Sequence, residues 1–313
     1  MKIEYSLYEL KPRYSTFKSR EGALLKVTFE EGLVGYADCH AWPELGDFPL
    51  NQQLSNLSQG KLSQLTACSL ELAKMDAKFR SLKVSAFNER QIPKSHYLGT
   101  HFIDLSFQAV ENITQKGFSH IKLKVGKDLK KEIQVLLNLF GETSLKLRLD
   151  FNETLSRTDF QIFLHSIEKI KGKIDFIEDP FPFDAYAWKE IQEKEWKLGC
   201  DRQFQAGIGQ QEAACVLIVK PAVVSQQQLN QRCSQKKIVT SYLGHPLGQV
   251  AAAYIATKID PACDLVHGLC SHTAYRPNVF SAYLGEGPFF SIPPGWGFGY
   301  DEELSKVSWK VLS

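Results

Sequence analysis

The sequence predicts an α/β protein in which a barrel of alternating strands and helices follows a small α+β domain. Three observations predict this arrangement. From about Ile92 onward, short apolar runs alternate with amphipathic segments of about 10–15 residues, the rhythm of repeated strand–helix units. The first part of the chain lacks that rhythm. Finally, five consecutive apolar runs each end in an ionisable side chain.

The α+β domain is predicted over residues 1–91. Strand-like runs cover 2–9, 23–29 and 34–38, with Glu31-Gly32 as a hairpin turn between the last two. A loop with Trp42-Pro43 follows, and the apolar positions between Leu62 and Arg80 have helical spacing. The stretch Gly285–Gly299 is rich in Gly, Pro and aromatic residues. We therefore expect residues 286–313 to return to this domain.

The barrel is predicted over residues 92–285. Its strand-like runs are His96–Leu98, Ser119–Val125, Ser144–Asp150, Lys173–Glu178, Trp196–Asp201, Val216–Lys220, Ile238–Ser241 and Leu265–Val266. This makes about eight parallel strands, the number that closes a barrel. The segment Arg202–Glu212 is Gln- and Gly-rich and is expected to hold at most a short helix. An open doubly wound sheet is the alternative, but no glycine-rich nucleotide motif follows any strand.

Composition excludes several classes of protein. The formal net charge is +2 and the basic residues are dispersed, so no nucleic-acid footprint is expected. No apolar run approaches the ~20 residues that cross a bilayer, so no membrane association is expected. The seven cysteines include no CxxC pair and are interpreted as reduced thiols. With no export signal visible, we expect a cytoplasmic location.

The charged strand ends are the most informative feature. The five runs end in Lys122-Leu123-Lys124, Asp150, Glu178, Asp201 and Lys220. The carboxyl ends of parallel barrel strands meet at one face, where active sites lie. Because strand side chains alternate with period two, Lys122 and Lys124 share a face, as do Arg148 and Asp150. We therefore expect these charged groups to converge at the mouth of the barrel.

The chemistry of this set indicates a divalent ion and a lysine base. Three carboxylates with no His or Cys at an equivalent position favour Mg²⁺ over zinc. A bound dication lets neighbouring carboxylates stay ionised and lowers the pKa of a nearby lysine toward neutrality. The substrate that suits such a site is a small carboxylic acid with a weakly acidic α-hydrogen.

The same residues resemble the enolase superfamily, in particular its muconate-lactonising subgroup. The matching motifs are Lys122-Leu123-Lys124, Asp150-Phe151-Asn152, Glu178-Asp179-Pro180, Asp201 and Lys220-Pro221. Their order fits, with 26 residues from Lys124 to Asp150, then 28 to Glu178, 23 to Asp201 and 19 to Lys220. The resemblance covers essentially the whole chain. It implies a modified (β/α)7β barrel of the TIM type with an α+β capping domain.

The resemblance also implies a role for each position. Mg²⁺, which Mn²⁺ can replace, has Asp150, Glu178 and Asp201 as expected ligands. Lys124 is the expected base, and Lys220 the second acid/base or a stabilising cation. The residues expected to contact substrate are Lys122, Arg148, Trp42 on a capping loop over about 32–47, and Ser241 and Gly244 of the loop after the seventh strand.

Several reactions fit this site. The compact length favours a dehydrating lyase of the subgroup, and the Asp-x-Asp pair of dipeptide epimerases is missing from Val266–Cys270. An N-acylamino acid racemase or dipeptide epimerase on the same two lysines is the alternative. A Schiff-base aldolase using Lys124 or Lys220, and a barrel that only binds a ligand, are further hypotheses.

Overall fold

The structure is a computed structural model that describes residues 1–13, 18–30, 32–99, 105–202, 213–231 and 233–313. Glu31 of the predicted hairpin turn and residues 203–212 of the Gln- and Gly-rich segment lie outside this part. The chain forms two compact units. The first unit comprises residues 1–94, 220–231 and 239–313, and the second comprises 95–219 and 232–238. The first unit thus holds the predicted capping residues together with most of the chain after Val219.

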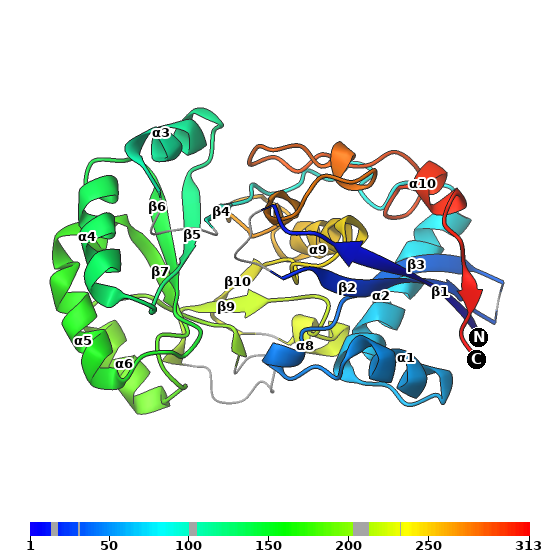
Figure 1. Ribbon diagram of the computed structural model, residues 1–313, viewed down its shortest axis with the longest axis horizontal. Coiled ribbons are helices and arrows are strands. Elements are labelled where there is room, and N and C mark those ends of the chain that lie inside the picture. Colours follow the sequence, from blue (N-terminus) through cyan, green and yellow to red (C-terminus); the bar gives the residue numbers. More distant parts are fainter. Residues whose placement is uncertain (14–17, 31, 100–104, 203–212, 232) are drawn as a thin grey trace. The chain divides into compact units, whose positions relative to one another are not determined.

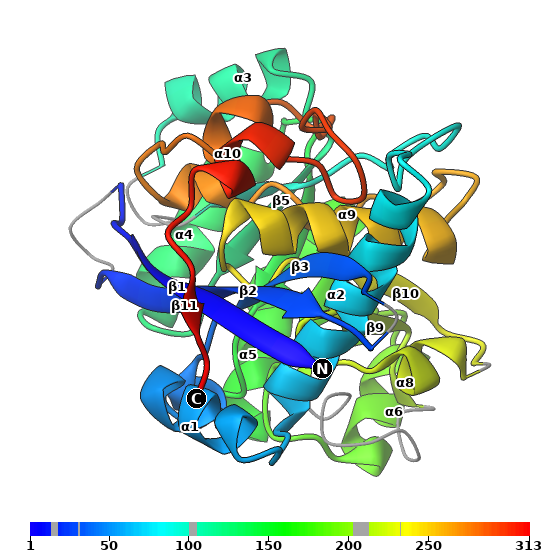
Figure 2. The ribbon, with the colours of Figure 1, turned by 90° about the vertical axis from the view of Figure 1, so that its right-hand side faces the viewer.

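The first unit is built on a four-stranded sheet in the order β11-β1-β2-β3 (Figure 2). Its strands are β1 (Lys2–Leu10), β2 (Arg20–Thr28), β3 (Val34–Cys39) and β11 (Lys310–Val311), all antiparallel to their neighbours. The central strand β2 is buried around Ala23–Leu25, and α2 (Gln64–Ser81) packs against β3 and β2. The three predicted N-terminal strands are therefore confirmed.

Helices and short turns complete the first unit. They are η1 (Pro43–Leu45), α1 (Leu50–Ser58), α2, α8 (Gln226–Asn230), α9 (Pro246–Ile259), η5 (His272–Ala274), η6 (Ser281–Tyr283) and α10 (Asp301–Ser305). Helix α2 begins with a capping box in which Ser63 and Thr66 satisfy each other's backbone N–H. Because β3 continues to Cys39, the loop that carries Trp42 is shorter than the predicted 32–47 and contains η1.

The end of the chain packs on α2 and β1. Gly297 exchanges backbone hydrogen bonds with Val84 and Ala86, and the Phe298 amide donates to the buried Asp76 carboxylate. Arg80 joins these segments, because its guanidinium bonds Asp76 on its own helix and the Gly299 carbonyl. The Gly- and Pro-rich tail therefore lies within the first unit, next to residues 76–86.

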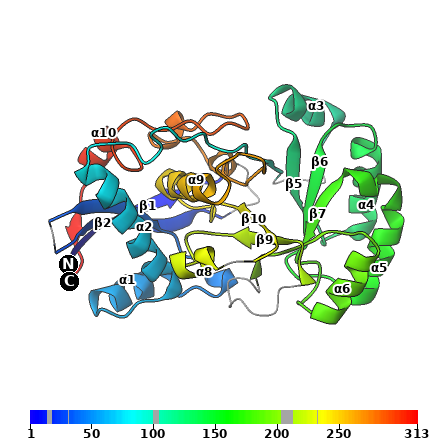
Figure 3. The same ribbon diagram turned by 180° about the vertical axis from the view of Figure 1, so that it is seen from behind.

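The second unit is built on a parallel sheet whose order, β10-β9-β8-β7-β6-β5-β4, follows the sequence. The strands are β4 (Tyr97–Gly99), β5 (His120–Lys124), β6 (Lys146–Asp150), β7 (Ile174–Glu178), β8 (Leu198–Cys200), β9 (Val216–Val219) and β10 (Lys236–Val239). The crossovers are α3 (Phe107–Gln115), α4 (Leu129–Phe140), α5 (Arg157–Ser166) with η3 (Glu168–Lys173), and α6 (Ala185–Glu193). Helices α4, α5 and α6 line one side of β5–β7 in Figures 1 and 3.

The alternation along β6 matches the prediction. Leu147 and Leu149 are fully buried among apolar neighbours, while Arg148 and Asp150 occupy the other face of the strand. Parallel pairing places Lys124 of β5 opposite Asp150, and Asp150 opposite Glu178 of β7. Consecutive strand ends are therefore in register, which brings their terminal side chains together.

The predicted eighth strand at Leu265–Val266 is wrong. Within the described residues the sheet has seven strands, and the neighbouring segment contributes only one isolated bridge, between Thr240 and Gly268. Gly268 exchanges backbone hydrogen bonds with Val239 and Ser241, and the His267 amide donates to the Lys94 carbonyl. The segment is too short to form a ladder, because it ends in a loop directly after these contacts.

In the described part of the chain, no helix is long and apolar enough to cross a lipid bilayer.

Candidate active site

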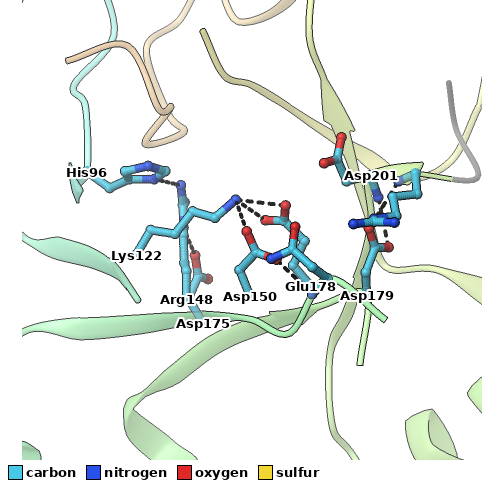
Figure 4. Close-up of polar contacts among 10 residues, drawn as sticks. His96, Lys122, Arg148, Asp150, Asp175, Glu178, Asp179 and Asp201 are labelled. Carbon is cyan, nitrogen blue, oxygen red and sulfur yellow. Dashed lines mark hydrogen bonds and ion pairs between the residues drawn. The ribbon is translucent and has the colours of Figure 1, made fainter. Parts of the chain in front are cut away.

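Three carboxylates mark the ends of three consecutive strands in the second unit. Asp150 ends β6, Glu178 ends β7, and Asp201 directly follows β8. All three side chains are buried, and Glu178 is only 1% exposed. Figure 4 shows Asp150 and Glu178 side by side. Burial of several acids so close together requires a compensating positive charge.

Lys122 supplies a positive charge at this point. Its ammonium lies 2.7 Å and 2.6 Å from the two carboxylate oxygens of Glu178 and 3.0 Å from Asp150 Oδ2 (Figure 4). Burial by itself lowers the pKa of Lys122, but attraction to Asp150, Glu178 and Asp201 outweighs it and raises the pKa. Lys122 is therefore an ammonium held between two acids. The predicted lowering of lysine pKa values depends on a bound divalent ion and stays a prediction.

The donor set fits a hard divalent cation. The Asp150 and Glu178 oxygens converge on one cation, the Lys122 ammonium, and carboxylate oxygens are the ligands that Mg²⁺ prefers. Among the described residues, no three His, Cys, Asp or Glu side chains are grouped closely enough to form a complete metal site by themselves. Asp150, Glu178 and Asp201 therefore remain the predicted ligands.

Two neighbouring residues orient these acids. The Asn152 backbone and side-chain amides donate to Asp150 Oδ1 at 3.1 Å and 2.9 Å. Both carboxylate oxygens of Asp179 accept backbone amides, from Asp201 at 3.1 Å and from Arg202 at 3.0 Å. Burial, then repulsion from Asp201 and Glu178, raises the pKa of Asp179. These contacts fix the strand-end backbone that carries the predicted ligands.

Arg148 lies two residues before Asp150, on the same face of β6. Its Nε donates to Asp175 at 2.8 Å, and one terminal nitrogen lies 2.9 Å from His96 Nδ1 (Figure 4). The guanidinium also stacks over the Phe176 ring. The buried guanidinium therefore has a carboxylate, an imidazole and an aromatic face as partners. Its predicted contact with substrate stays a prediction.

Lys124 ends β5 and is exposed, in contrast to the buried Lys122 two residues earlier. It pairs in register with Asp150 across the sheet. An exposed lysine at a strand end beside this cluster of acids can contact a bound molecule. This position is consistent with the predicted base.

The remaining predicted residues belong to the first unit. Lys220 follows β9, and its ammonium lies 5.8 Å from the centre of the Tyr242 ring. Tyr242 in turn donates its hydroxyl to Asp47 and accepts the Trp42 indole N–H at its carbonyl. Ser241 Oγ lies 2.5 Å from Ser271 Oγ. Gly244 lies against Asp38 and His40.

The sequence did not identify the supporting residues Asp175, His96, Tyr242 and His40. Asn152 and Asp179 stand inside recognised motifs, and both have positive φ angles, 51° and 41°, which Asn and Asp tolerate better than most residues. An Asn or Asp directly after a strand-end acid could therefore have indicated a tight turn that supports the site. The other four make contacts over 27 or more residues of sequence, which no local pattern reveals.

Comparisons with known proteins agree with this fold. The muconate lactonizing enzyme of Mycobacterium smegmatis in complex with muconolactone superposes with a TM-score of 0.79 at 15% identity, over 98% of both chains. The dipeptide epimerase of Enterococcus faecalis, complexed with Mg and a dipeptide, has a TM-score of 0.75 at 15% identity, over 95% of this chain and 98% of that one. The chain therefore has the fold of these muconate-lactonizing and epimerase enzymes, with acids at the ends of three consecutive barrel strands.

Sequence comparison identifies the family to which the chain belongs. The sequence model of the o-succinylbenzoate synthase N-terminal domain matches residues 3–79. The o-succinylbenzoate synthase of Bdellovibrio bacteriovorus is 35% identical over 328 aligned positions, covering 100% of this chain and 99% of that protein. The chain therefore belongs to the o-succinylbenzoate synthase family and is an enzyme of this lyase type.

Proposed function

We propose that this chain is a Mg²⁺-dependent o-succinylbenzoate synthase, which dehydrates 2-succinyl-6-hydroxy-2,4-cyclohexadiene-1-carboxylate in menaquinone biosynthesis. The observation that carries the proposal is the 35% identity to the Bdellovibrio enzyme over the full length of both chains. The cluster of Lys122 with Asp150 and Glu178 supports the proposal, because it gathers two of the predicted ligands around one cation.

The proposal gives each charged residue a task. Asp150, Glu178 and Asp201 hold the divalent ion, which when bound supplies Lewis-acid stabilisation of negative charge on the substrate carboxylate. Lys122 stays protonated beside these acids and limits their repulsion. Lys124 takes the α-proton, and the Lys220 ammonium stabilises the resulting enediolate.

The second half-reaction uses the same base. Lys124, now protonated, returns its proton to the departing hydroxyl group, so that water leaves and the ring becomes aromatic. One lysine serves both half-steps only when the proton and the hydroxyl leave from the same face of the ring. The net change is loss of one water molecule, so no oxidant or reductant is needed.

An ultraviolet assay of o-succinylbenzoate formation tests the proposal. The purified chain is assayed with Mg²⁺, then with excess EDTA, then with Mg²⁺ restored. We expect turnover in the first and third conditions only. Absence of product in all three, with a folded protein, would contradict the synthase assignment.

A racemase or epimerase is the second candidate, and the likeness to the Enterococcus dipeptide epimerase favours it. Two lysines also suit proton removal from one face and return at the other. In deuterated solvent, an epimerase places deuterium at the α-position of recovered N-acylamino acid or dipeptide. A dehydrating synthase instead converts its own substrate to an aromatic product.

A further inference from the structure

A buried group of polar side chains in the first unit has no part in the proposed reaction. Tyr8 of β1 places its hydroxyl 2.6 Å from Asp38 Oδ1 and 3.0 Å from His40 Nδ1. The His245 backbone amide, at the start of α9, donates to Asp38 Oδ2 at 2.8 Å. The group therefore connects β1, the end of β3 and the first turn of α9.

The hydrogen-bond pattern fixes the tautomer of His40. A tyrosine hydroxyl has one hydrogen, and an ionised carboxylate can only accept, so the Tyr8 hydrogen belongs to the bond with Asp38. The contact between His40 and Tyr8 then requires His40 Nδ1–H to donate to the Tyr8 oxygen. Burial, followed by repulsion from Arg20, lowers the pKa of His40 to about 4, so the ring is neutral. His40 Nε2 is consequently an acceptor.

A small cavity lies beside His40. His40 is 2% exposed, and its Nε2 has no hydrogen-bond partner among the residues that the structure describes. A cavity of about 20 Å³ is lined by His40 together with Asp38, Leu72, Pro221, Ala222, Tyr242, Gly244, Gly248 and Ala252. A buried water molecule needs roughly 10–15 Å³ and polar partners. The cavity therefore has room for one water molecule and little more.

Two glycines bring the start of α9 close to the same group. A Cβ at Gly248 would lie 2.7 Å from Asp38 Oδ2, and a Cβ at Gly244 would lie 2.9 Å from His40 Cβ. Both distances are shorter than side chains tolerate. Only glycine at position 244 lets the backbone of the Gly244 loop, residues 241–245, pack against Asp38 and His40. Only glycine at position 248 lets the first turn of α9 pack against Asp38.

We propose that Asp38, Tyr8 and His40 form a hydrogen-bond chain that binds one buried water molecule at His40 Nε2 and positions the Gly244 loop. Tyr8 and Asp38 are positioning residues, since they act through the imidazole and the loop. The tautomer and the water site lie outside the proposed function, whereas the effect of the loop on substrate binding rests on it.

Nitrogen NMR of the full chain labelled with ¹⁵N-histidine tests the tautomer directly. Burial raises the pKa of Asp38 to about 7. The measurement is made at pH 8.5, above this value, so that Asp38 is ionised. The His40 signals are assigned by their loss in His40→Gln. We expect Nδ1 to be protonated and Nε2 to show the shift of an unprotonated ring nitrogen. A protonated Nε2 in the wild-type chain would overturn the proposal, whatever the variants do.

Tyr8→Phe then tests the chain of hydrogen bonds. Loss of the hydroxyl removes the acceptor for Nδ1–H, so we expect the His40 proton to redistribute toward Nε2. Tyr5→Phe, the same change on the same strand, is the matched control and should leave the His40 signals unchanged. Equal shifts in both variants would contradict a specific role for Tyr8.

A crystal structure at a resolution that shows ordered water tests the other half of the proposal. We expect a water oxygen about 3 Å from His40 Nε2. An empty cavity would refute the water site.

If synthase activity is present, Asp38→Asn should raise KM several-fold with a smaller effect on kcat, as expected for a displaced loop. The NMR result stands independently of that activity.

Discussion

The ammonium of Lys122 lies within 2.7 Å of both carboxylate oxygens of Glu178. Glu178 ends β7, two strands away from the β5 strand that carries Lys122, so the bond spans the intervening strand β6. Asp150 of β6 is the third member, at 3.0 Å from the same ammonium. Three adjacent strands are thus joined through one cation at their carboxyl ends.

Lys122→Met should destabilise the fold when divalent ions are removed. The change leaves Asp150 and Glu178 buried without their partner, which typically costs about 3–5 kcal/mol. The free energy of unfolding, measured by urea titration in EDTA, reports this loss, and Mg²⁺ should restore part of it. Lys124→Met, at the exposed end of the same strand, is the control and should change stability by less than about 1 kcal/mol.

Mg²⁺ should raise the melting temperature of the wild-type chain. A ligand that binds only the folded state at 100 times its Kd stabilises by about 2.7 kcal/mol. Asp150→Asn and Glu178→Gln keep the side-chain shapes but remove ligand charge, so most of this gain should disappear. Asp175→Asn, which alters the carboxylate paired with Arg148, should retain it. Equal loss in all three would argue against a site at the strand ends.

Lys124→Ala should abolish turnover while leaving the response to Mg²⁺ intact. Removal of a general base typically costs about 10²–10⁴-fold in rate, and more when the same group also acts as the acid. Steady-state assays measure the rate, and thermal melts with and without Mg²⁺ measure the metal response. Lys127→Ala, a nearby exposed lysine, serves as the comparison and should keep full activity.

Asp179→Ala should weaken metal binding without touching a predicted ligand. Its carboxylate accepts the backbone amides of Asp201 and Arg202, and both would lose their acceptor. Loss of such an orienting contact typically costs about 10–100-fold in metal affinity. Asp179→Asn keeps a side-chain acceptor and tolerates the positive φ, so this variant should lose less metal affinity than Asp179→Ala. Calorimetric titration with Mg²⁺ distinguishes the two variants.

Stability should depend on pH through His40 and Asp38 with opposite signs. The pKa of His40 is lowered to about 4, so the unfolded chain binds an extra proton between about pH 6.5 and 4, and acid destabilises the fold. The pKa of Asp38 is raised to about 7, so the folded chain binds the extra proton between about pH 7 and 4. Acid therefore favours the fold through Asp38.

Urea titrations at pH 7.5, 6 and 5 separate the two contributions. We expect His40→Gln to reduce the loss of stability in acid and Asp38→Asn to increase it. Each effect should amount to about 1 kcal/mol per pH unit. Parallel pH profiles for the wild type and both variants would show that neither group titrates in this range.

Local patterns in the sequence were sufficient to predict most of the fold. The alternation of Leu147, Arg148, Leu149 and Asp150 correctly predicted which side chains of β6 face the apolar core. Helix α1 is not among the elements predicted from the sequence, and its segment contains Asn and Ser, which favour helices less than Ala, Leu or Lys do. Burial of Leu54 and Leu57 stabilises it instead, a tertiary effect that local propensity does not contain.

The sequence predicted those parts of the candidate site in which an ionisable residue stands at the carboxyl end of a strand. Asp150 and Glu178 both satisfied that condition, and the structure brings them to the same ammonium. The partner of Arg148 was not predictable, because Asp175 lies at the beginning of the next strand, where a carboxylate has no special meaning. The chain from Tyr8 to His40 likewise depends on strand pairing between distant segments.

The short strand β11 has a consequence for handling this protein. Lys310 and Val311 pair with Tyr5 and Glu4, so the last residues of the chain cover one side of β1 (Figure 1). Deleting them would expose the backbone of Glu4 and Tyr5 on this side of β1, and unpaired groups on an edge strand favour edge-to-edge aggregation. A fusion tag at the carboxyl terminus therefore calls for a flexible spacer, and trimming the terminus for crystallisation should lower solubility.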